Sequence, residues 1–188
     1  MGFFDSLLGR SRPAVANLDV LFSVPQAALT LQTNGYVFAG SGAVCYRPNE
    51  GAAFAATETD AKALLNADDG PAVERVDDGF GFRWLTLSHQ PDDVSGMVTD
   101  LHAVNSSLTD AGFGQSLLCS TVNFTTADNK PFAIVYLYKR GTFYPFAPLP
   151  GDKRDNALEL QLRGIVADDI PIEADLSRWL AIWGAPGL

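Results

Sequence analysis

The residues of this chain that could do chemistry gather in the stretch VYLYKRGTFYPFAP, at positions 135–148, and just after it. The candidates are four cations and three aromatic rings: Lys139, Arg140, Phe143, Tyr144, Phe146, Lys153 and Arg154. Aromatic and arginine side chains are favoured at the centres of protein interfaces, so a protein interaction site is the first hypothesis. The guanidinium of Arg140 or Arg154 could instead hold the anionic group of a small ligand or substrate. A basic pocket near Lys139 is therefore the alternative.

The same stretch also has purely structural interpretations. Tyr136 and Tyr138 alternate as the side chains of a β-strand do, and the rings at positions 143–148 could cover one edge of a core. The lysine–arginine pair is as typical of a solvated turn as of a site. Further along the chain, Trp179 and Trp183 either pack on the protein's own sheet or contact a partner.

The sequence contains no motif for catalysis or metal binding. His89 and His102 are its two histidines, and there is no HExxH, CxxC, EF-hand loop or Walker-type phosphate loop. Four Asp-Asp pairs occupy predicted turns or helix ends, where short acidic side chains cap backbone N–H groups. We therefore predict no catalytic residue, no metal site and no cofactor.

The overall charge restricts the classes of partner. The chain has 13 basic and 22 acidic side chains, giving a formal net charge of -9. This charge repels the nucleic-acid backbone, so we expect no nucleic-acid partner. It also opposes broad adsorption to anionic lipid, although a local basic patch could still dock on a membrane or on an acidic protein.

Cysteine usage and hydropathy predict the compartment. Cys45 and Cys119 each lie in an apolar strand-like run, and we expect buried thiols in a reducing cytoplasm rather than a disulfide or a reactive site. No segment reaches the roughly 18 uninterrupted apolar residues of a spanning helix. We therefore expect a cytoplasmic protein that could contact the inner face of the membrane at its periphery.

The first twelve residues form a separate short segment in the sequence. Within MGFFDSLLGR, helical spacing places four apolar side chains on one face: Phe3, Phe4, Leu7 and Leu8. This face predicts contact with a membrane or a partner protein. Gly9 and Pro13 mark a linker, and residues 13–188 are expected to form one α+β domain.

Helices and hairpins alternate through residues 13–188. Apolar periodicity predicts a helix that restarts at Pro25, a helix opened by Thr57, and a strong helix across 91–112. A further helix capped by Asp155 is expected, followed by another that places Leu176, Trp179, Leu180 and Trp183 on one stripe.

Three hairpins are predicted between these helices. They are two short strands around a Gly-Ser-Gly turn at 40–42, a hairpin turning at Asp77-Asp78-Gly79, and an apolar pair within 116–138. In the second hairpin, Phe80, Phe82 and Trp84 are expected on one strand face. Hairpins favour antiparallel pairing, so the predicted fold class is α+β, a mainly antiparallel sheet with helices packed on it. The recurring order of helix and hairpin also suggests two similar halves.

Several long strings resemble one protein family along nearly the whole chain. They are MGFFDSLLGR, LFSVPQAALTLQ, TDLHAVNSSLTDAGFGQSLLCS, YLYKRGTFYPFAP, RDNALELQLR and RWLAIWGAPGL. In this order they resemble the PspA-associated PspAB family. The resemblance implies an accessory or regulatory role in the phage-shock-type envelope stress response. It also implies PspA, a coiled-coil membrane-remodelling protein, or HtpX, a membrane zinc metalloprotease, as the protein partner.

Overall fold

The computed structural model describes residues 16–66 and 72–188. We call residues 1–12 the head. Its predicted contact face, formed by Phe3, Phe4, Leu7 and Leu8, lies outside the described residues. In chain order, the elements are η1 (Leu18–Ser23), α1 (Val24–Thr33), β1 (Val37–Tyr46), α2 (Ala52–Leu65), β2 (Glu74–Asp77), β3 (Arg83–Ser88), α3 (Val94–Asp110), η2 (Gly114–Ser116), β4 (Leu117–Thr125), β5 (Pro131–Leu137), β6 (Thr142–Phe146), β7 (Pro148–Leu149), β8 (Lys153–Arg154), α4 (Asn156–Val166) and η3 (Leu176–Arg178).

Six of the strands form one sheet with the order β2-β3-β1-β4-β5-β6. Every neighbouring pair in this sheet is antiparallel, and β7 and β8 form a separate small ribbon. The predicted fold class, α+β with a mainly antiparallel sheet, is confirmed. The hairpin within 116–138 is also confirmed, as β4 and β5. The possible similarity of the two halves stays a prediction.

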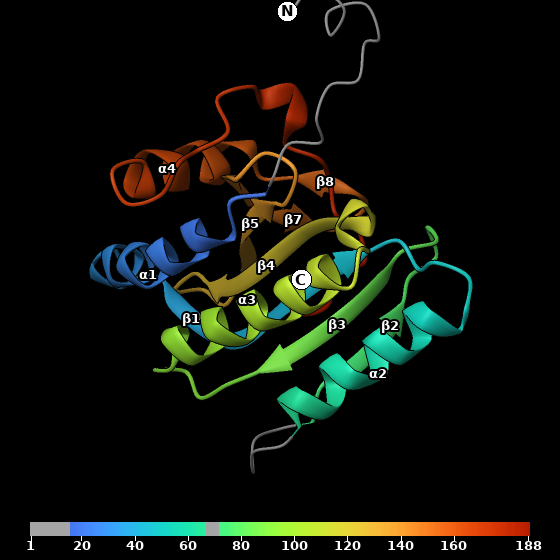
Figure 1. Cartoon of the computed structure of the whole chain (residues 1–188). Helices are drawn as coiled ribbons and strands as arrows, with labels where there is room; N and C mark the ends of the chain where they lie inside the picture. Colours follow the sequence, from blue (N-terminus) through green and yellow to red (C-terminus); the bar gives the residue numbers. More distant parts are fainter. Residues whose placement is uncertain (1–15, 67–71) are drawn as a thin grey trace, which may run out of the picture.

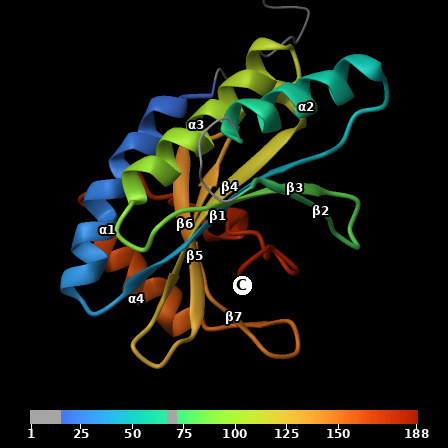
Figure 2. The same cartoon turned by 90° about the horizontal axis from the view of Figure 1, so that it is seen from below.

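The first face of the sheet carries the helices (Figures 1 and 2). The apolar stripe of α3 is fully buried at Met97, Val98, Leu101, Val104 and Leu108, and it packs with α1, α4 and the facing strand residues in one large core. This stripe is the one that the sequence predicts. Burial of several complete apolar side chains contributes roughly 1.5–3 kcal/mol for each of them, which holds α3 on the sheet.

The second face of the sheet is covered by the segment 171–188, which is mostly irregular (Figure 2). We call this segment the C-terminal strap. Its Trp179 and Ala185 are buried with strand residues that point away from the helices, among them Ala43, Tyr144 and Phe146. The strands β1, β4, β5 and β6 are therefore buried on both faces, by helices on one face and by the strap on the other, whereas the edge strand β2 is exposed.

Local sequence signals account for the helix ends. Asp93 and Asp155 cap α3 and α4, with side chains that accept hydrogen bonds from the N–H groups of Gly96 and Leu158. Gly112 has a φ of 86° just beyond α3, where glycine is favoured. The helix predicted to restart at Pro25 does so, since η1 ends at Ser23 and α1 carries the proline in its first turn.

His89 ties the end of β3 to α3. Its Nδ1 lies 2.9 Å from Asp93 Oδ2 and its Nε2 lies 2.8 Å from Asp100 Oδ2. Burial disfavours the imidazolium, but hydrogen bonds with these two carboxylates outweigh burial and raise the pKa of His89.

The predicted turn at Gly40–Gly42 is wrong. Residues 37–46 form one long strand, β1, which carries a register shift between Phe38 and Gly42 rather than a reversal. Gly40 has a φ of 70°, and a Cβ on Gly42 would lie 2.6 Å from the carbonyl oxygen of Thr121. These glycines thus permit a bulge and a close approach of β4, which are two other uses of glycine in strands.

Three further predictions are corrected. The stripe of Leu176, Trp179, Leu180 and Trp183 is not a helix, because only the short η3 forms and the strap then runs irregularly across the sheet. In the second hairpin the positive φ falls on Gly81 rather than Gly79, so Phe80 and Phe82 lie in the loop before β3. Helix α2 also begins at Ala52, before Thr57.

Candidate functional site

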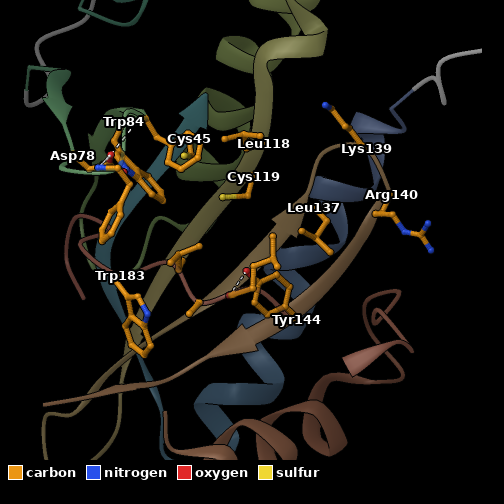
Figure 3. Close-up of a pocket in the computed structure, with 15 residues that line it drawn as sticks. Cys45, Asp78, Trp84, Leu118, Cys119, Leu137, Lys139, Arg140, Tyr144 and Trp183 are labelled. Carbon is orange, nitrogen blue, oxygen red and sulfur yellow. Dashed lines mark hydrogen bonds between the residues drawn. The ribbon is translucent and has the colours of Figure 1, made fainter. Parts of the chain in front are cut away.

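A cavity of about 400 Å³ lies between the second face of the sheet and the strap (Figure 3). Its floor is formed by strands β1, β3, β4, β5 and β6, and its sides by the β2–β3 loop and residues 180–183. This volume falls within the roughly 300–1,000 Å³ that is usual for small-molecule sites. The cavity is therefore the candidate functional site.

Small side chains in the middle of the floor leave this space open. Cys45 on β1 and Cys119 on β4 are register partners, and both are buried free thiols, as the sequence predicts. The hydrogen bond with Cys119, together with burial, raises the pKa of the Cys45 thiol. Because the thiolate is the nucleophilic and metal-binding form, Cys45 is an apolar floor residue rather than a reactive one.

Aromatic rings surround these thiols. Trp84 on β3 donates its Nε1–H to Asp78 Oδ2 at 3.0 Å, and the Tyr144 hydroxyl on β6 donates to the carbonyl oxygen of Leu180 at 2.9 Å. Trp183 of the strap completes the wall (Figure 3). The polar atoms of Trp84 and Tyr144 already have partners, so these rings present carbon to the cavity.

Asp78 is the acidic residue of the lining, and it organises the β2–β3 loop. Its Oδ1 accepts hydrogen bonds from the N–H groups of Phe80 and Phe82 at 2.8 and 2.9 Å. Burial works against ionisation, but the hydrogen bonds from Trp84 and these N–H groups outweigh burial and lower the pKa of Asp78. The carboxylate is thus engaged with its own loop.

Two of the predicted cations line the cavity. Lys139 and Arg140 follow β5 in the turn before β6, and both are exposed. Arg140 Nε donates to Glu173 Oε2 at 3.1 Å, and its guanidinium points away from the cavity (Figure 3). Lys139 forms no ion pair with the residues that the structure describes.

The other two predicted cations lie elsewhere. Arg154 is mostly buried, donates its Nε–H to Glu159 Oε1 at 2.9 Å, and also donates to the carbonyl oxygen of Trp179. Its guanidinium lies 5.0 Å from the centre of the Phe146 ring. Lys153 is exposed on β8. The convergence of Lys139, Arg140 and Arg154 in one basic pocket is therefore not found, because Arg154 holds the strap and the start of α4.

The three predicted aromatic contacts are interior. Phe143 packs in the helix-side core, whereas Tyr144 and Phe146 pack on the strap side, and each is at most 1% exposed. They occupy strand β6, where alternation sends neighbours to opposite faces. Lys139, Arg140 and Lys153 are the members of the predicted set that remain available at the surface.

The strap is fastened at several points. Glu173 is 3% exposed and its carboxylate accepts hydrogen bonds from Arg140, Thr142 and the N–H of Asp175. Trp179 stacks on Tyr144 with a centroid distance of 5.9 Å and donates its Nε1–H to the carbonyl oxygen of Glu173. The Trp179 ring thus packs in the protein's own core, as one of its two interpretations expects.

Sequence reasoning missed most of the cavity. Cys45, Trp84 and Cys119 were assigned to strands without any reason to place them on the same face, and Leu180 was assigned to a helix. The available signal lies in β1, where every second residue from 41 to 45 is small: Ser41, Ala43 and Cys45. A strand face made of small residues indicates a partner or a void above it.

Comparison with known proteins identifies the family. The family model described as PspA associated protein B matches residues 1–187. The chain belongs to the PspAB family. The family resemblance seen in the sequence strings is thereby confirmed, and the description of PspAB associates this chain with PspA. No curated protein and no solved structure matched the chain.

Two further observations describe this PspAB member. Within residues 16–66 and 72–188, no helix has the length and apolar character needed to cross a bilayer. The same residues contain no cluster of three or more His, Cys, Asp or Glu side chains placed to hold a metal ion.

Proposed function

We propose that this protein is an accessory or regulatory component of the PspA-type membrane stress response and acts by protein–protein interaction. The observation that carries the proposal is the match of the PspA associated protein B model to residues 1–187. We propose PspA as the direct partner and HtpX as the second candidate. In this proposal the protein binds PspA or HtpX at the cytoplasmic side of the membrane.

The rim of the cavity is the proposed docking surface. We define the rim by four exposed residues that line the cavity mouth: Phe80, Lys139, Arg140 and Leu180. Phe80 is 65% and Leu180 is 60% exposed, so two large apolar side chains stand at the cavity mouth in contact with water. Apolar and aromatic side chains flanked by cations are suited to a partner surface that is apolar at its centre and acidic at its border.

Capture of purified PspA or HtpX by the tagged full-length chain tests this proposal. The combined Phe80→Ser and Lys139→Glu variant should lose at least about tenfold in affinity, because it removes an apolar anchor and reverses a charge. Lys62→Glu on α2, which packs on the helix side of the sheet, is the matched charge control. Failure of the unaltered chain to capture either protein would refute the partner assignment. Unchanged capture by the folded double variant would refute the rim as the site.

The head supports a second, peripheral contact with lipid. Phe3, Phe4, Leu7 and Leu8 are the residues that motivate it. The full-length chain should float with liposomes, and deletion of residues 1–12 should abolish this flotation, because the proposal gives the protein no other lipid anchor. Equal flotation of both forms would contradict it.

A further inference from the structure

The cavity of about 400 Å³ is a space that the protein's own side chains do not fill. Protein interiors are packed as densely as organic crystals, and voids larger than a water molecule are few. Here the space persists because Cys45 and Cys119 are short while Trp84, Tyr144 and Trp183 stand around them. The exposed apolar surface of the lining belongs to Phe80 and Leu180 and to the half-buried Phe82, Leu118, Ile182 and Trp183. An occupant would remove this surface from water.

The body of the occupant must be apolar. The ring N–H of Trp84 and the hydroxyl of Tyr144 are used within the protein, and Cys45 and Cys119 are weak hydrogen-bonding groups. The Nε1–H of Trp183 is the ring donor of the lining that has no hydrogen bond with the described residues. A polar ligand would therefore lose its hydration here for few new partners, at a cost for every unpaired group. An alkyl chain has no polar groups to leave unpaired, and removal of its apolar surface from water makes its binding free energy more favourable.

The charge at the mouth specifies the other end of the occupant. Lys139 is exposed beside the cavity and has no ion pair with the described residues, whereas Arg140 is bound to Glu173 and Asp78 is bound within its loop. A negatively charged head at the mouth would thus meet one available cation. The cavity has room for one alkyl chain, and its volume lies near the lower end of the range for ligand sites.

We propose that this cavity binds a single-chain amphiphile with an anionic head group, with the alkyl chain over Cys45 and Cys119 and the head at Lys139. The shared chemistry is that of a fatty acid or of a single-chain lipid phosphate. The inference does not rest on the partner proposed above, because it follows from the cavity and its lining.

Titration of the full-length chain with monomeric probes tests the ligand class. Hexadecanoate and hexadecyl phosphate are the anionic probes, and hexadecyltrimethylammonium is the cationic control of the same chain length. We expect saturable binding of an anionic probe, with one chain per protein, and the tighter of the two probes identifies the head group. Absence of binding by both anionic probes, or equal binding of the cationic probe, would overturn the proposal.

Tryptophan fluorescence locates the bound chain. Trp84 and Trp183 line the cavity, so hexadecanoate carrying a bromine on its chain should quench their emission. Cys119→Leu fills the cavity from the floor and Ala181→Trp fills it from the strap side. At least one of the two should fold, and a folded variant should lose quenching and binding at least about tenfold, because each fills space that the alkyl chain would occupy. Undiminished binding to a folded, filled variant would overturn the site.

A charge reversal tests the position of the head. Lys139→Glu should weaken hexadecanoate binding by about fivefold or more, which corresponds to the loss of a solvent-exposed ion pair. It should leave the binding of uncharged hexadecanol unchanged. Lys153→Glu, which reverses an equally exposed cation on β8, is the matched control and should have no effect. Equal effects of the two reversals would overturn the assignment of Lys139.

Discussion

Replacement of Glu173 by alanine should loosen the C-terminal strap. Glu173 is 3% exposed, and its side chain joins the strap to β6 and to the turn before it. Thr142 Oγ1 donates to its carboxylate at 3.0 Å, Arg140 Nε donates at 3.1 Å, and the N–H of Asp175 donates at 3.1 Å. The substitution removes the common acceptor of all three donors.

The exposure of the three donors determines the size of the effect. Arg140 and Asp175 are exposed, so water replaces the carboxylate for both, and their losses are small. Thr142 is partly buried, and a hydrogen bond to a charged acceptor there contributes about 1.5–3 kcal/mol. We expect a loss of about 2 kcal/mol in the free energy of unfolding. For a chain of this size, this loss lowers the melting temperature by about 4–8 °C.

The pKa of Glu173 gives the effect a pH dependence. Burial disfavours the ionised form, but hydrogen bonds from Asp175, Thr142 and Arg140 outweigh burial and lower the pKa below its ordinary value of 4.5. A group with a lowered folded-state pKa stabilises the protein above its unfolded-state pKa. The contribution of Glu173 should therefore be complete above pH 4.5 and disappear as the pH falls through the lower, folded-state value.

Thermal unfolding of the unaltered chain and Glu173→Ala at pH 7 and at pH 3.5 measures both quantities. Arg140→Met is the matched control, since it removes only the exposed half of the ion pair and should cost at most about 1 kcal/mol. Equal melting temperatures of Glu173→Ala and the unaltered chain would refute the role of this carboxylate. A larger effect of Arg140→Met would show that the ion pair, rather than the Thr142 bond, holds the strap.

Four other perturbations follow from the structure. His89→Gln should destabilise the protein most below pH 6.5. The folded-state pKa of His89 is raised, so the stabilisation by its imidazolium is complete there and is lost as the pH rises through the folded-state pKa. Urea unfolding from pH 5.5 to 8.5 measures this effect, and a stability difference between the two proteins that does not change with pH would contradict it. Gly42→Ala should cost about 1–3 kcal/mol, because its Cβ would meet β4 and Met97. By contrast, Gly164→Ala, in open space on α4, should gain about 0.5–1 kcal/mol; urea midpoints of the two variants should move in opposite directions. Iodoacetamide should label Cys45 in the folded protein at pH 8 more slowly than a free thiol, because burial and the neighbouring thiol raise its pKa; labelling at the rate of a free thiol would contradict this.

The elements predicted best are those whose signal is local. The stripe of α3 and the cap at Asp155 depend on residues a few positions apart, and the structure places both as local physics requires. The start of α3 differs, since the helix expected across 91–112 begins at Val94, with Asp93 as its cap. The apolar hairpin of β4 and β5 was predicted for the same reason, because its turn and its strands are contiguous in the sequence.

Long-range contacts decided the elements that sequence reasoning got wrong. Leu176, Trp179, Leu180 and Trp183 have helical spacing, but Trp179 binds Tyr144 and Glu173 instead, and these tertiary contacts override a weak helical preference. Gly40 and Gly42 are typical of a turn, yet Gly42 lies within a strand, where the absence of a side chain lets β4 approach closely at Thr121. Neither partner is visible from the local sequence.

The candidate site was predictable in part. Lys139 and Arg140 lie at the mouth of the cavity, but they do not converge with Arg154 as the basic pocket hypothesis requires. Arg154 lies away from the cavity because it binds Glu159 on α4 and the carbonyl oxygen of Trp179 in the strap. The positions of these two partners depend on how α4 and the strap fold back. The facing thiols required the register of β1 on β4, which joins residues more than seventy positions apart.

The pairing of β1 with β4 also has a consequence for how the chain emerges from the ribosome. β1 bonds to β3 within the first ninety residues, whereas its other neighbour ends at Thr125. A nascent chain that has formed β2, β3 and β1 therefore presents β1 as an open edge, because the side of β1 that faces β4 has no partner strand yet. Such an edge recruits other strands. The protein is most prone to aggregate in the interval between the pairing of β1 with β3 and the synthesis of β4. Slower synthesis of residues 89–125 would lengthen this interval.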